Sequence, residues 1–569
     1  MGVNYDLGMT TKQQVYNLIN FIPYHNKLIE GVIKKIKQTQ ITEIKEDTLG
    51  VLFEKLIREQ ERKNSGQFYT PQEIVNYMVD FLNIKPESTI LDPTCGCGVF
   101  LVTAHNYLRK INQNAIQNIY GVDLNNSATK IARINLWLRN SNNSNSLKIL
   151  EKNIKTGNSV VENKIVDKKA FNWNKEFSEI LGGGGFDFIV GNPPYVTLKN
   201  KRDYDIKESI FSKIANGSTN AASLVIAKSF ELLKEGGVMA FVLPKTLIRV
   251  NSYSRLRGFL FENSKILHIY DLGSYFKGVK GEQIILFIQK TTDKNAIKEN
   301  KVLIKVRDKK EDSLGSQKTF YIPQKTLKKY NTLLMFEDEK YYTLVKKIKG
   351  ENLENIAKIF RGITISPNSE IISKSTSKQR KPIIKGNNIS KFFNTNGFFI
   401  DVVKLTGNLS KLKYLEKDKI ILQNIFSSES GIISCIDKKG QLTYDTVTNV
   451  VLTDSSFNLE YVFGLLNSKL LNFYLKYAVY NKSKLTMHTD KAYIGKIPIK
   501  KADKETQKEI IKLVQKINST KDKKDVLREV DKKVYVLYKI NKKEQTLIDK
   551  ALEKTMSKKS LWYNGGKNE

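Results

Sequence analysis

The chain has 569 residues, of which 94 are Lys or Arg and 58 are Asp or Glu, giving a formal net charge of +36. This length allows several domains with sizeable cores, and the charge favours a polyanionic partner, nucleic acid first, although an A+T-rich genome would also enrich Lys, Asn and Ile. Three cysteines exclude a disulfide framework and fit a reducing cytoplasm, and Cys95 and Cys97 lack the further ligands that zinc requires. The sequence has no apolar run of about 18 residues, so no membrane-spanning helix is predicted.

Residues 1–65 are predicted to form a helical segment. Its first residues, Met1 to Lys12, lack the apolar core of a signal peptide. Beyond them, apolar residues such as Val15, Leu18 and Ile22 recur at three- and four-residue spacing, which is typical of helices with one buried face. The segment is shorter than a typical nuclease domain, so we expect no fused nuclease in it.

Residues 66–310 show alternating strand and helix patterns. Strands are predicted at residues 89–91, 119–122, 186–190, 238–243 and 284–288. Helical patterns separate the strands, for example at residues 74–81, 127–138 and 221–233. Short apolar strands that alternate with helices predict an α/β domain with a parallel, doubly wound sheet.

The pattern changes after about residue 310. Residues 311–500 combine short mixed strands with loops rich in Lys, Ser and Asn, which predicts a second domain of mixed α+β structure. Residues 501–569 are rich in Lys and are predicted to be helical, with Ile510, Ile511, Val514 and Ile517 on one face. We therefore expect four parts, which are residues 1–65, 66–310, 311–500 and 501–569.

A glycine-rich loop follows the first predicted strand. It contains Asp92, Pro93, Cys95, Gly96 and Gly98, and a helix begins directly after it. Glycines at the carboxyl edge of a sheet let the backbone approach a ligand. Because the loop begins with an acidic residue and no P-loop lysine follows, it suits a ligand with a cationic amine better than one with phosphates.

A second acidic residue, Asp123, ends the next predicted strand. A carboxylate in this position is the usual group that binds two ribose hydroxyls. The alternative is that Asp123 caps the helix that begins near Asn125.

The third feature is the sequence Asn192-Pro193-Pro194-Tyr195, which follows the apolar strand at residues 186–190. Two prolines remove backbone donors and end a strand. The loop therefore presents one amide side chain, backbone carbonyls and one aromatic ring. Such a loop suits a flat group that carries an amine, such as the exocyclic amine of a nucleobase.

In this order, the three features resemble the gamma group of DNA N6-adenine methyltransferases, with its TaqI-like and Eco57I-like members, which use S-adenosylmethionine (AdoMet). The segment Gly66 to Pro71 resembles the separate AdoMet-binding element of that family. A weaker resemblance to TaqI-like target recognition domains covers Arg361 to Ile363, Pro382 to Gly386 and Leu465 to Ser468. The resemblance implies a Rossmann-like AdoMet-dependent methyltransferase core, followed by a target recognition domain that binds double-stranded DNA.

The resemblance also implies which residues form the site. AdoMet contacts are implied for Phe68, Tyr69, Thr70, Asp92, Pro93, Cys95, Gly96, Gly98, Asp123, Leu124 and Asn158. The catalytic residues that it implies are Asn192, Pro193, Pro194 and Tyr195. Tyr195 and Phe276 are implied to stack on the target base, and no metal is implied.

The proposed chemistry needs acceptors for the amine of adenine. If the Asn192 side-chain carbonyl and the Pro193 backbone carbonyl accept its two N–H bonds, N6 can become pyramidal toward the methyl group. No strong base is needed, because the alkylated ammonium is acidic. Since N6 is paired in a duplex, the base must be flipped out, and stacking on a ring would stabilise it by about 1–3 kcal/mol.

Several alternatives stay open from the sequence. Enzymes that methylate glutamine amides or ribosomal RNA amines use the same loop, but they do not need a large basic domain after residue 310. Residues 49–57 also resemble modification subunits of multi-subunit restriction systems, which take DNA recognition from a partner. A regulator that binds AdoMet and DNA without turnover would have no use for Asn192.

We favour a sequence-specific DNA methyltransferase of a restriction–modification or phage-defence system, although an orphan epigenetic enzyme fits the sequence equally well. The expected protein is prokaryotic, cytoplasmic and nucleoid-associated. A monomer is favoured, a separate restriction endonuclease is the expected partner in a restriction–modification setting, and no membrane partner is expected.

Overall fold

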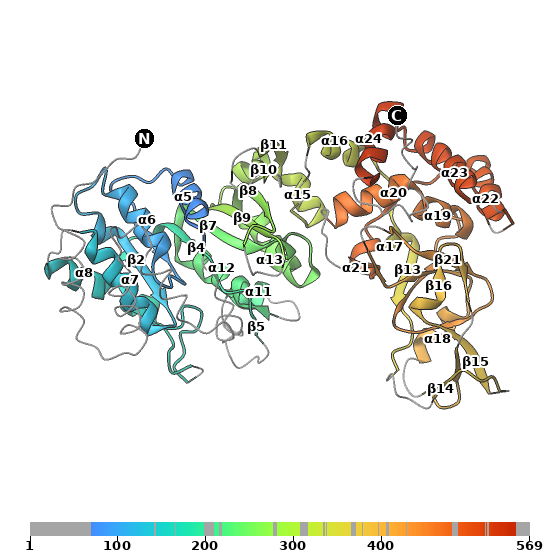
Figure 1. The fold of residues 1–569 in the computed structure, drawn as a ribbon, viewed down its shortest axis with the longest axis horizontal. Coiled ribbons are helices and arrows are strands. Elements are labelled where there is room, and N and C mark those ends of the chain that lie inside the picture. Colours follow the sequence, from blue (N-terminus) through green and yellow to red (C-terminus); the bar gives the residue numbers. More distant parts are fainter. Residues whose placement is uncertain are drawn as a thin grey trace, which may run out of the picture. The chain divides into compact units, whose positions relative to one another are not determined.

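The computed structural model describes most of the chain from Thr70 to Glu553 (Figure 1). The residues described are 70–553 apart from 141–143, 166, 199–209, 215–218, 277–280, 308–313, 315–316, 334–335, 337, 366–370, 378, 396–397, 406–408, 428–429, 481–486, 518 and 521–522. The helical segment predicted at residues 1–65 and the predicted cofactor contacts Phe68 and Tyr69 lie outside the described residues. Within them, no helix is both long enough and apolar enough to span a bilayer.

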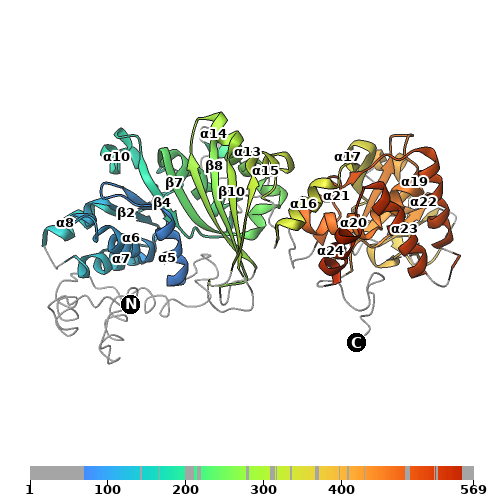
Figure 2. The same cartoon turned by 90° about the horizontal axis from the view of Figure 1, so that it is seen from above.

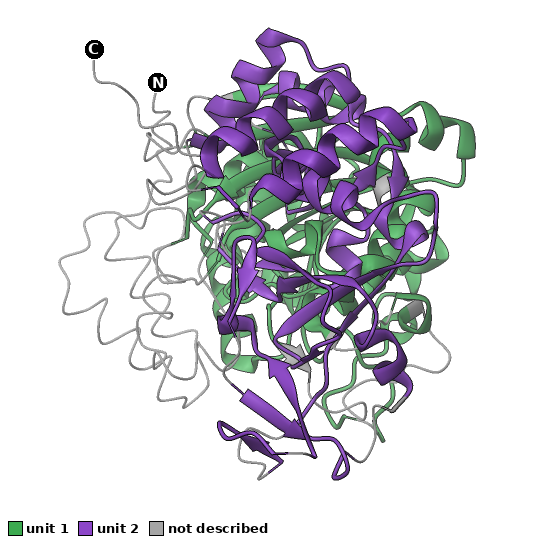
Figure 3. Ribbon diagram, turned by 90° about the vertical axis from the view of Figure 1, so that its right-hand side faces the viewer, with its two compact units in different colours: residues 1–333 green, residues 334–569 purple. Residues whose placement is uncertain are grey.

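The chain divides into two compact units, residues 1–333 and residues 334–569 (Figure 3). The predicted boundary near residue 310 falls between strands β10 (Lys301–Arg307) and β11 (Gln317–Pro323). These strands pair in antiparallel fashion along their whole length, so they belong to one hairpin in the first unit. The division of the chain therefore lies after this hairpin.

Within the described residues, the first unit is built on a sheet of nine strands in the order β11-β10-β8-β9-β7-β4-β1-β2-β3. The strands are β1 (Ile90–Asp92), β2 (Ile119–Asp123), β3 (Ile154–Thr156), β4 (Phe186–Gly191), β7 (Leu233–Pro244), β8 (Ser264–Gly273), β9 (Gln283–Lys290), β10 and β11. Strands β3, β2, β1, β4 and β7, which are neighbours in this order, are parallel. This confirms the predicted α/β fold with a Rossmann-like sheet.

The prediction of a parallel sheet is wrong for strands β9 and β11, which are antiparallel to their neighbours, whereas β8 and β10 are parallel. Strand β9 pairs in antiparallel fashion with β7 on one side and with β8 on the other. The connection between β8 and β9, residues 274–282, is too short for the crossover helix that parallel neighbours require, which takes a dozen residues or more. A hairpin is therefore the arrangement open to these two strands.

Helices α5 (Gln72–Phe81), α6 (Val99–Leu108) and α7 (Asn126–Leu138) lie together on one side of the strands (Figure 2). Their buried residues share a core cluster with Ala240 and Val242 of β7. Because side chains alternate along a strand, the intervening Phe241 points to the opposite face. Helix α12 (Ala221–Leu232) contacts β7 there, so helices cover both faces.

Among its described residues, the second unit contains two sheets of four strands each, besides three pairs of short strands. One has the order β13-β23-β19-β21, with β13 (Ala357–Arg361), β23 (Val447–Leu452), β19 (Lys419–Gln423) and β21 (Ser434–Asp437) all antiparallel to their neighbours. The other has the order β14-β18-β15-β22, with strands at Ile372–Ser373, Phe398–Asp401, Arg380–Ile384 and Leu442–Thr443. Mixed α+β structure is thus confirmed for this part of the chain.

The C-terminal residues form helices that pack inside the second unit. Helices α22 (Lys504–Ile517), α23 (Lys523–Leu537) and α24 (Lys542–Glu553) contact α19 (Leu459–Leu466) and α20 (Lys469–Tyr474). In α22 the buried face includes Ile510, Val514 and Ile517, whereas Ile511 is half-buried. The basic helical segment therefore shares its core with the domain before it.

One buried ion pair joins β19 to β21. Lys419 and Asp437 are paired in register, and their side chains are 0% and 1% exposed. The Lys419 Nζ and Asp437 Oδ2 atoms are 2.5 Å apart, and burial lowers the pKa of Lys419. Asp437 also accepts hydrogen bonds from the backbone of Lys439 and Gln441, so its carboxylate holds both the strand and the turn that follows.

Replacing Asp437 with Ala should destabilise the second unit by about 3–5 kcal/mol, because it leaves the Lys419 ammonium buried without its carboxylate. The matched control is Glu416→Ala, which breaks an ion pair with Lys381 whose side chains are 50% and 52% exposed. Such surface pairs contribute about 0–1 kcal/mol. Differential scanning calorimetry should show a large decrease in Tm for Asp437→Ala alone. Equal shifts would contradict the assigned role of the buried pair.

Candidate active site

The predicted site residues gather at one edge of the sheet in the first unit. Strands β1, β2, β3 and β4 are parallel neighbours, so their carboxyl ends meet at the same edge. The loops after these strands carry Asp92 to Gly98, Asp123 and Leu124, Asn158, and Asn192 to Tyr195. Four segments that are far apart in the sequence are thus brought together.

The glycine-rich loop after β1 has the backbone shape that glycine permits. Gly96 and Gly98 have φ angles of +52° and +88°, in the left-handed region that other residues rarely adopt. The Gly96 N–H donates to Asp123 Oδ2 at 2.9 Å, and a Cβ on Gly96 would have open space around it. Pro93 and Cys95 are buried in contrast, so any ligand contact from them would come from the backbone.

Two buried carboxylates lie at this edge. Asp92 is 1% exposed and accepts a hydrogen bond from the Thr94 N–H, while Asp123 is 7% exposed. Burial, together with the nearby Asp123, raises the pKa of Asp92 to about 8. Burial also raises the pKa of Asp123, although hydrogen bonds from the backbone of Asn125 and Gly96 oppose that shift. The two groups therefore favour a ligand that brings positive charge or hydroxyl donors.

Asp123 also begins the cap of helix α7. Its Oδ1 accepts from the Asn125 N–H at 2.8 Å, and Asn125 in turn caps the helix by accepting from Ser127 and Ala128. The capping interpretation and the ligand interpretation are compatible, since Oδ1 and Oδ2 each accept one backbone N–H and each carboxylate oxygen can accept a further bond. The neighbouring Leu124 side chain is 48% exposed and adds apolar surface beside the carboxylate.

Asn158 lies after β3, next to the end of β2. The Gly157 N–H donates to the Asp123 carbonyl at 2.9 Å, which fixes this loop beside the second carboxylate. The Asn158 amide donates to Asp167 Oδ2 at 2.6 Å and accepts from the Val160 N–H. Its side chain thus holds the shape of its own loop.

The loop after β4 brings the amide of Asn192 to the same edge. Gly191 precedes it, and a Cβ there would lie 2.8 Å from Asp92 Oδ1, so only glycine lets β4 approach this carboxylate. The Tyr195 hydroxyl donates to Asn192 Oδ1 at 2.6 Å and also lies 3.0 Å from the Val242 carbonyl oxygen. The Asn192 Nδ2 group donates to Thr70 Oγ1 at 3.0 Å.

One further contact of this loop was not expected from the sequence. Asn220, which caps α12, also donates to the Tyr195 carbonyl at 3.1 Å. An Asn before an apolar helix predicts a cap, but nothing in the sequence indicates this second bond. Phe276 is 8% exposed and belongs to the core cluster of the sheet, so its predicted stacking on a base lacks an open ring face here and stays a prediction.

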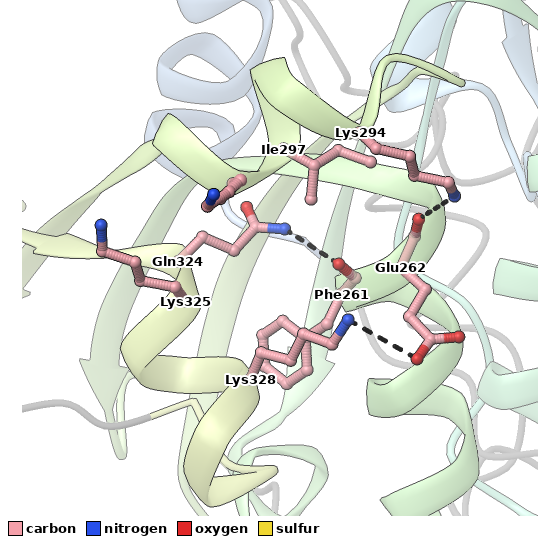
Figure 4. Close-up of a pocket in the computed structure, with 8 residues that line it drawn as sticks. Phe261, Glu262, Lys294, Ile297, Gln324, Lys325 and Lys328 are labelled. Atoms are coloured by element: carbon pink, nitrogen blue, oxygen red, sulfur yellow. Dashed lines mark hydrogen bonds and ion pairs between the residues drawn. The ribbon is translucent and has the colours of Figure 1, made fainter.

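A pocket of about 400 Å³ lies elsewhere in the first unit (Figure 4). It is lined by Phe261, Glu262, Lys294, Ile297, Lys298, Gln324, Lys325 and Lys328. The register of β7, β8 and β9 puts these residues at the edge where β4 and β7 begin, opposite the edge of the candidate site. Across the described residues, no group of three or more His, Cys, Asp or Glu side chains could hold a metal ion.

Two protein families match the chain. Residues 117–276 match the Eco57I restriction-modification methylase family, and residues 381–499 match the TaqI-like C-terminal specificity domain. The first match covers β2, β3, β4 and the loop with Asn192, and the second covers the β19 and β23 strands of the second unit.

The chain is also similar to curated proteins. It is 28% identical over 261 residues to the Type II methyltransferase M.VspI of Vibrio sp. (strain 343), covering 45% of this chain and 55% of that protein. It is 27% identical to the Type II restriction enzyme and methyltransferase RM.Eco57I of Escherichia coli, over 40% of this chain and 28% of that protein. The Type II methyltransferase M.HincII of Haemophilus influenzae is 21% identical, over 82% of this chain and 96% of that protein.

Among solved structures, the Type IIL restriction-modification enzyme MmeI in complex with DNA has a similar fold. Its TM-score is 0.58 at 13% identity, over 93% of this chain and 84% of that chain. At this identity the likeness concerns the fold alone. The match spans 28% of the length of RM.Eco57I and 55% of the length of M.VspI. Taken with the family matches, the chain joins an Eco57I-like restriction-modification methylase domain to a TaqI-like C-terminal specificity domain.

Proposed function

We propose that this protein is a sequence-specific DNA methyltransferase that transfers a methyl group from AdoMet to N6 of a flipped-out adenine in double-stranded DNA. The observation that carries the proposal is the meeting of the Asn192 amide with the buried Asp92 and Asp123 carboxylates at one sheet edge. The family matches support DNA as the substrate and a restriction–modification setting. A separate endonuclease partner is part of the same proposal.

The residues at this edge fit AdoMet. Asp123 offers a carboxylate for ribose hydroxyls, Leu124 offers exposed apolar surface for a purine ring, and Asp92 offers a counter-charge for an ammonium group. Gly96 leaves the backbone of the loop open to a ligand, since a Cβ there would have no neighbour within 4 Å. When bound, AdoMet supplies a methyl group activated by its sulfonium sulfur.

The catalytic role belongs to acceptors in the loop after β4. Asn192 Oδ1 and the Pro193 carbonyl would accept the two N–H bonds of adenine N6, which directs the nitrogen lone pair toward the methyl group. Developing positive charge on N6 then faces two fixed oxygen atoms, and such preorganised electrostatics is a large term in catalysis. The proton can leave to water, because an alkylated arylammonium is a strong acid.

Tyr195 has a second role in this proposal. Burial raises the pKa of its hydroxyl, so the group stays protonated and donates. Its two acceptors, Asn192 Oδ1 and the Val242 carbonyl, hold the ring in place beside the amide. A ring fixed in this way offers a face on which an extruded base can stack, worth about 1–3 kcal/mol.

Replacing Asn192 with Ala should lower the single-turnover rate of DNA methylation by about 10²–10³-fold, the usual effect of removing one preorganised group. AdoMet and DNA dissociation constants should change little. Asn263→Ala is the matched control, because that amide caps α13 (Ser254–Asn263) through the Phe259 carbonyl, away from the site. If the Asn192 variant lost AdoMet binding instead, its assigned role would be wrong.

The pH dependence of AdoMet affinity should report Asp92. In the free protein, Asp92 has a pKa of about 8 and is therefore largely neutral below pH 8. An ammonium ligand favours the ionised form, so binding releases a proton there, and affinity should rise by up to about tenfold per unit from pH 6 to pH 7.5. Asp123 and the Cys95 thiol are the other titratable groups close to this carboxyl.

Isothermal titration calorimetry with AdoMet at several pH values and in buffers of different ionisation enthalpy would measure this proton release. Asp92→Asn should make the AdoMet affinity independent of pH over this range. Asp187→Asn should not, because Asp187 lies near the start of β4 and accepts from Thr89. A flat profile for the unmodified protein would contradict the assignment.

The reaction itself is tested with methyl-labelled AdoMet and four substrates, which are duplex DNA, single-stranded DNA, ribosomal RNA and total protein. We expect label in duplex DNA, recovered as N6-methyladenine at one short sequence. Label in RNA or protein with none in DNA would overturn the proposal. Label in DNA as another methylated base would refute the adenine assignment alone.

A further inference from the structure

The hydroxyl of Thr70 meets the amide of Asn192 across 122 positions of sequence. The Asn192 Nδ2 group donates to Thr70 Oγ1 at 3.0 Å, and Thr70 is 3% exposed. Thr70 directly precedes Pro71, the N-cap of helix α5. The resemblance of this segment to an AdoMet-binding element does not account for this bond.

The position of Thr70 is fixed by the core. Ile74, Val75 and Met78 of α5 are 0% exposed and belong to the same cluster as Val190 of β4. The backbone on both sides of the Thr70–Asn192 bond is therefore anchored in one packed layer. A hydroxyl held in this way can hold the amide in turn.

An asparagine amide needs such a partner in order to present one chosen atom. Its oxygen and nitrogen ends have nearly the same shape but opposite hydrogen-bonding roles. If the amide turned by 180°, its NH₂ group would face the N–H bonds of the substrate amine, and two donors would oppose each other. In the observed orientation the amide has a partner at each end, Thr70 Oγ1 accepting from Nδ2 and the Tyr195 hydroxyl donating to Oδ1.

The bonds at the two ends of the amide differ in what a substrate would do to them. The Tyr195 hydroxyl has one proton and two acceptors within reach, Asn192 Oδ1 and the Val242 carbonyl. When an amine donates to Oδ1, the Tyr195 hydroxyl can donate to the Val242 carbonyl instead. The Thr70 bond lies on the far end of the amide and stays in place.

We propose that Thr70 is a positioning residue for methyl transfer, which fixes the Asn192 amide so that Oδ1 faces the adenine amine. This inference rests on the proposed function. It assigns the segment before α5 a part in the chemical step, in addition to the cofactor contact implied by its resemblance.

The test compares Thr70→Val, which keeps the branched shape without the acceptor, with Thr70→Ser, which keeps the hydroxyl. Thr103→Val is the matched control, because Thr103 accepts from Gln72 of the same helix α5 and donates to the Val99 carbonyl. The readouts are the single-turnover rate at saturating DNA and AdoMet, the AdoMet dissociation constant, and 2-aminopurine fluorescence at the target base.

Thr70→Val should slow transfer by at least about tenfold, as expected when a reacting group loses its alignment. Because both ligands are saturating, this rate is compared independently of any change in AdoMet affinity, and the fluorescence of the flipped base should stay within about twofold of the unmodified protein. Thr70→Ser and Thr103→Val should transfer at close to the normal rate. A normal single-turnover rate for Thr70→Val at saturating DNA and AdoMet would overturn the inference.

A second measurement does not depend on activity. In a double-mutant cycle of Thr70→Val and Asn192→Ala, the decreases in Tm should be less than additive, because each change removes the same bond. Additive decreases would overturn the inference. Failure of the unmodified protein to methylate DNA would instead overturn the proposed function, and with it the catalytic reading of Thr70, whatever the cycle shows.

Discussion

The parallel pairing of β1 with β2 on one side and with β4 on the other is the constraint on which the candidate site depends. The register sets Asp92 opposite Gly121, and Ile90 opposite Phe188. Because parallel strands share one carboxyl edge, the loops after all three strands open in the same direction. The chemistry is thus assembled by the sheet, while each loop keeps its own local geometry.

This edge is crowded, and the crowding connects packing to electrostatics. A Cβ on Gly191 would lie 2.8 Å from Asp92 Oδ1, and a Cβ on Gly121 would lie 2.7 Å from the Leu101 side chain and 3.1 Å from Cys95 Sγ. The missing side chains let the strands and helix α6 close around Asp92. Close approach of main chain and apolar groups removes water from the carboxyl, which is why its pKa rises to about 8. The same glycines that allow the fold therefore set the charge state of the site.

The sequence predicts the parts of this architecture that depend on local pattern. The apolar strands and the loops after them follow from periodicity, proline and glycine. Strand β8 was not among the predicted strands, because it buries polar side chains among its apolar ones. His268, for example, is 0% exposed and is satisfied by the Tyr77 hydroxyl and the Leu303 carbonyl, which come from distant segments. Strand direction, the Thr70–Asn192 bond and the burial of Phe276 likewise depend on tertiary partners that no local pattern encodes.

The same distinction applies to the TaqI-like part of the chain. Gly362 lies in one of the segments that resemble this domain, and a Cβ there would lie 2.2 Å from the Thr443 carbonyl oxygen. Asn467 lies in another, is 1% exposed, and bonds to the Ser434 hydroxyl and the Phe463 carbonyl. These two residues hold strands and helices of this unit together.

On the proposed function, recognition of the target sequence must therefore come from exposed side chains between such scaffold positions. Two lysines of this unit lie over aromatic rings. Lys358 Nζ lies 3.5 Å from the centre of the Tyr414 ring, and Lys385 Nζ lies 3.9 Å from the centre of the Phe398 ring. A cation over an aromatic face is oriented but keeps its charge available to a phosphate. Affinity for DNA and choice of sequence then rest on different residues, because phosphate contacts position a protein on the duplex whereas base contacts specify the site.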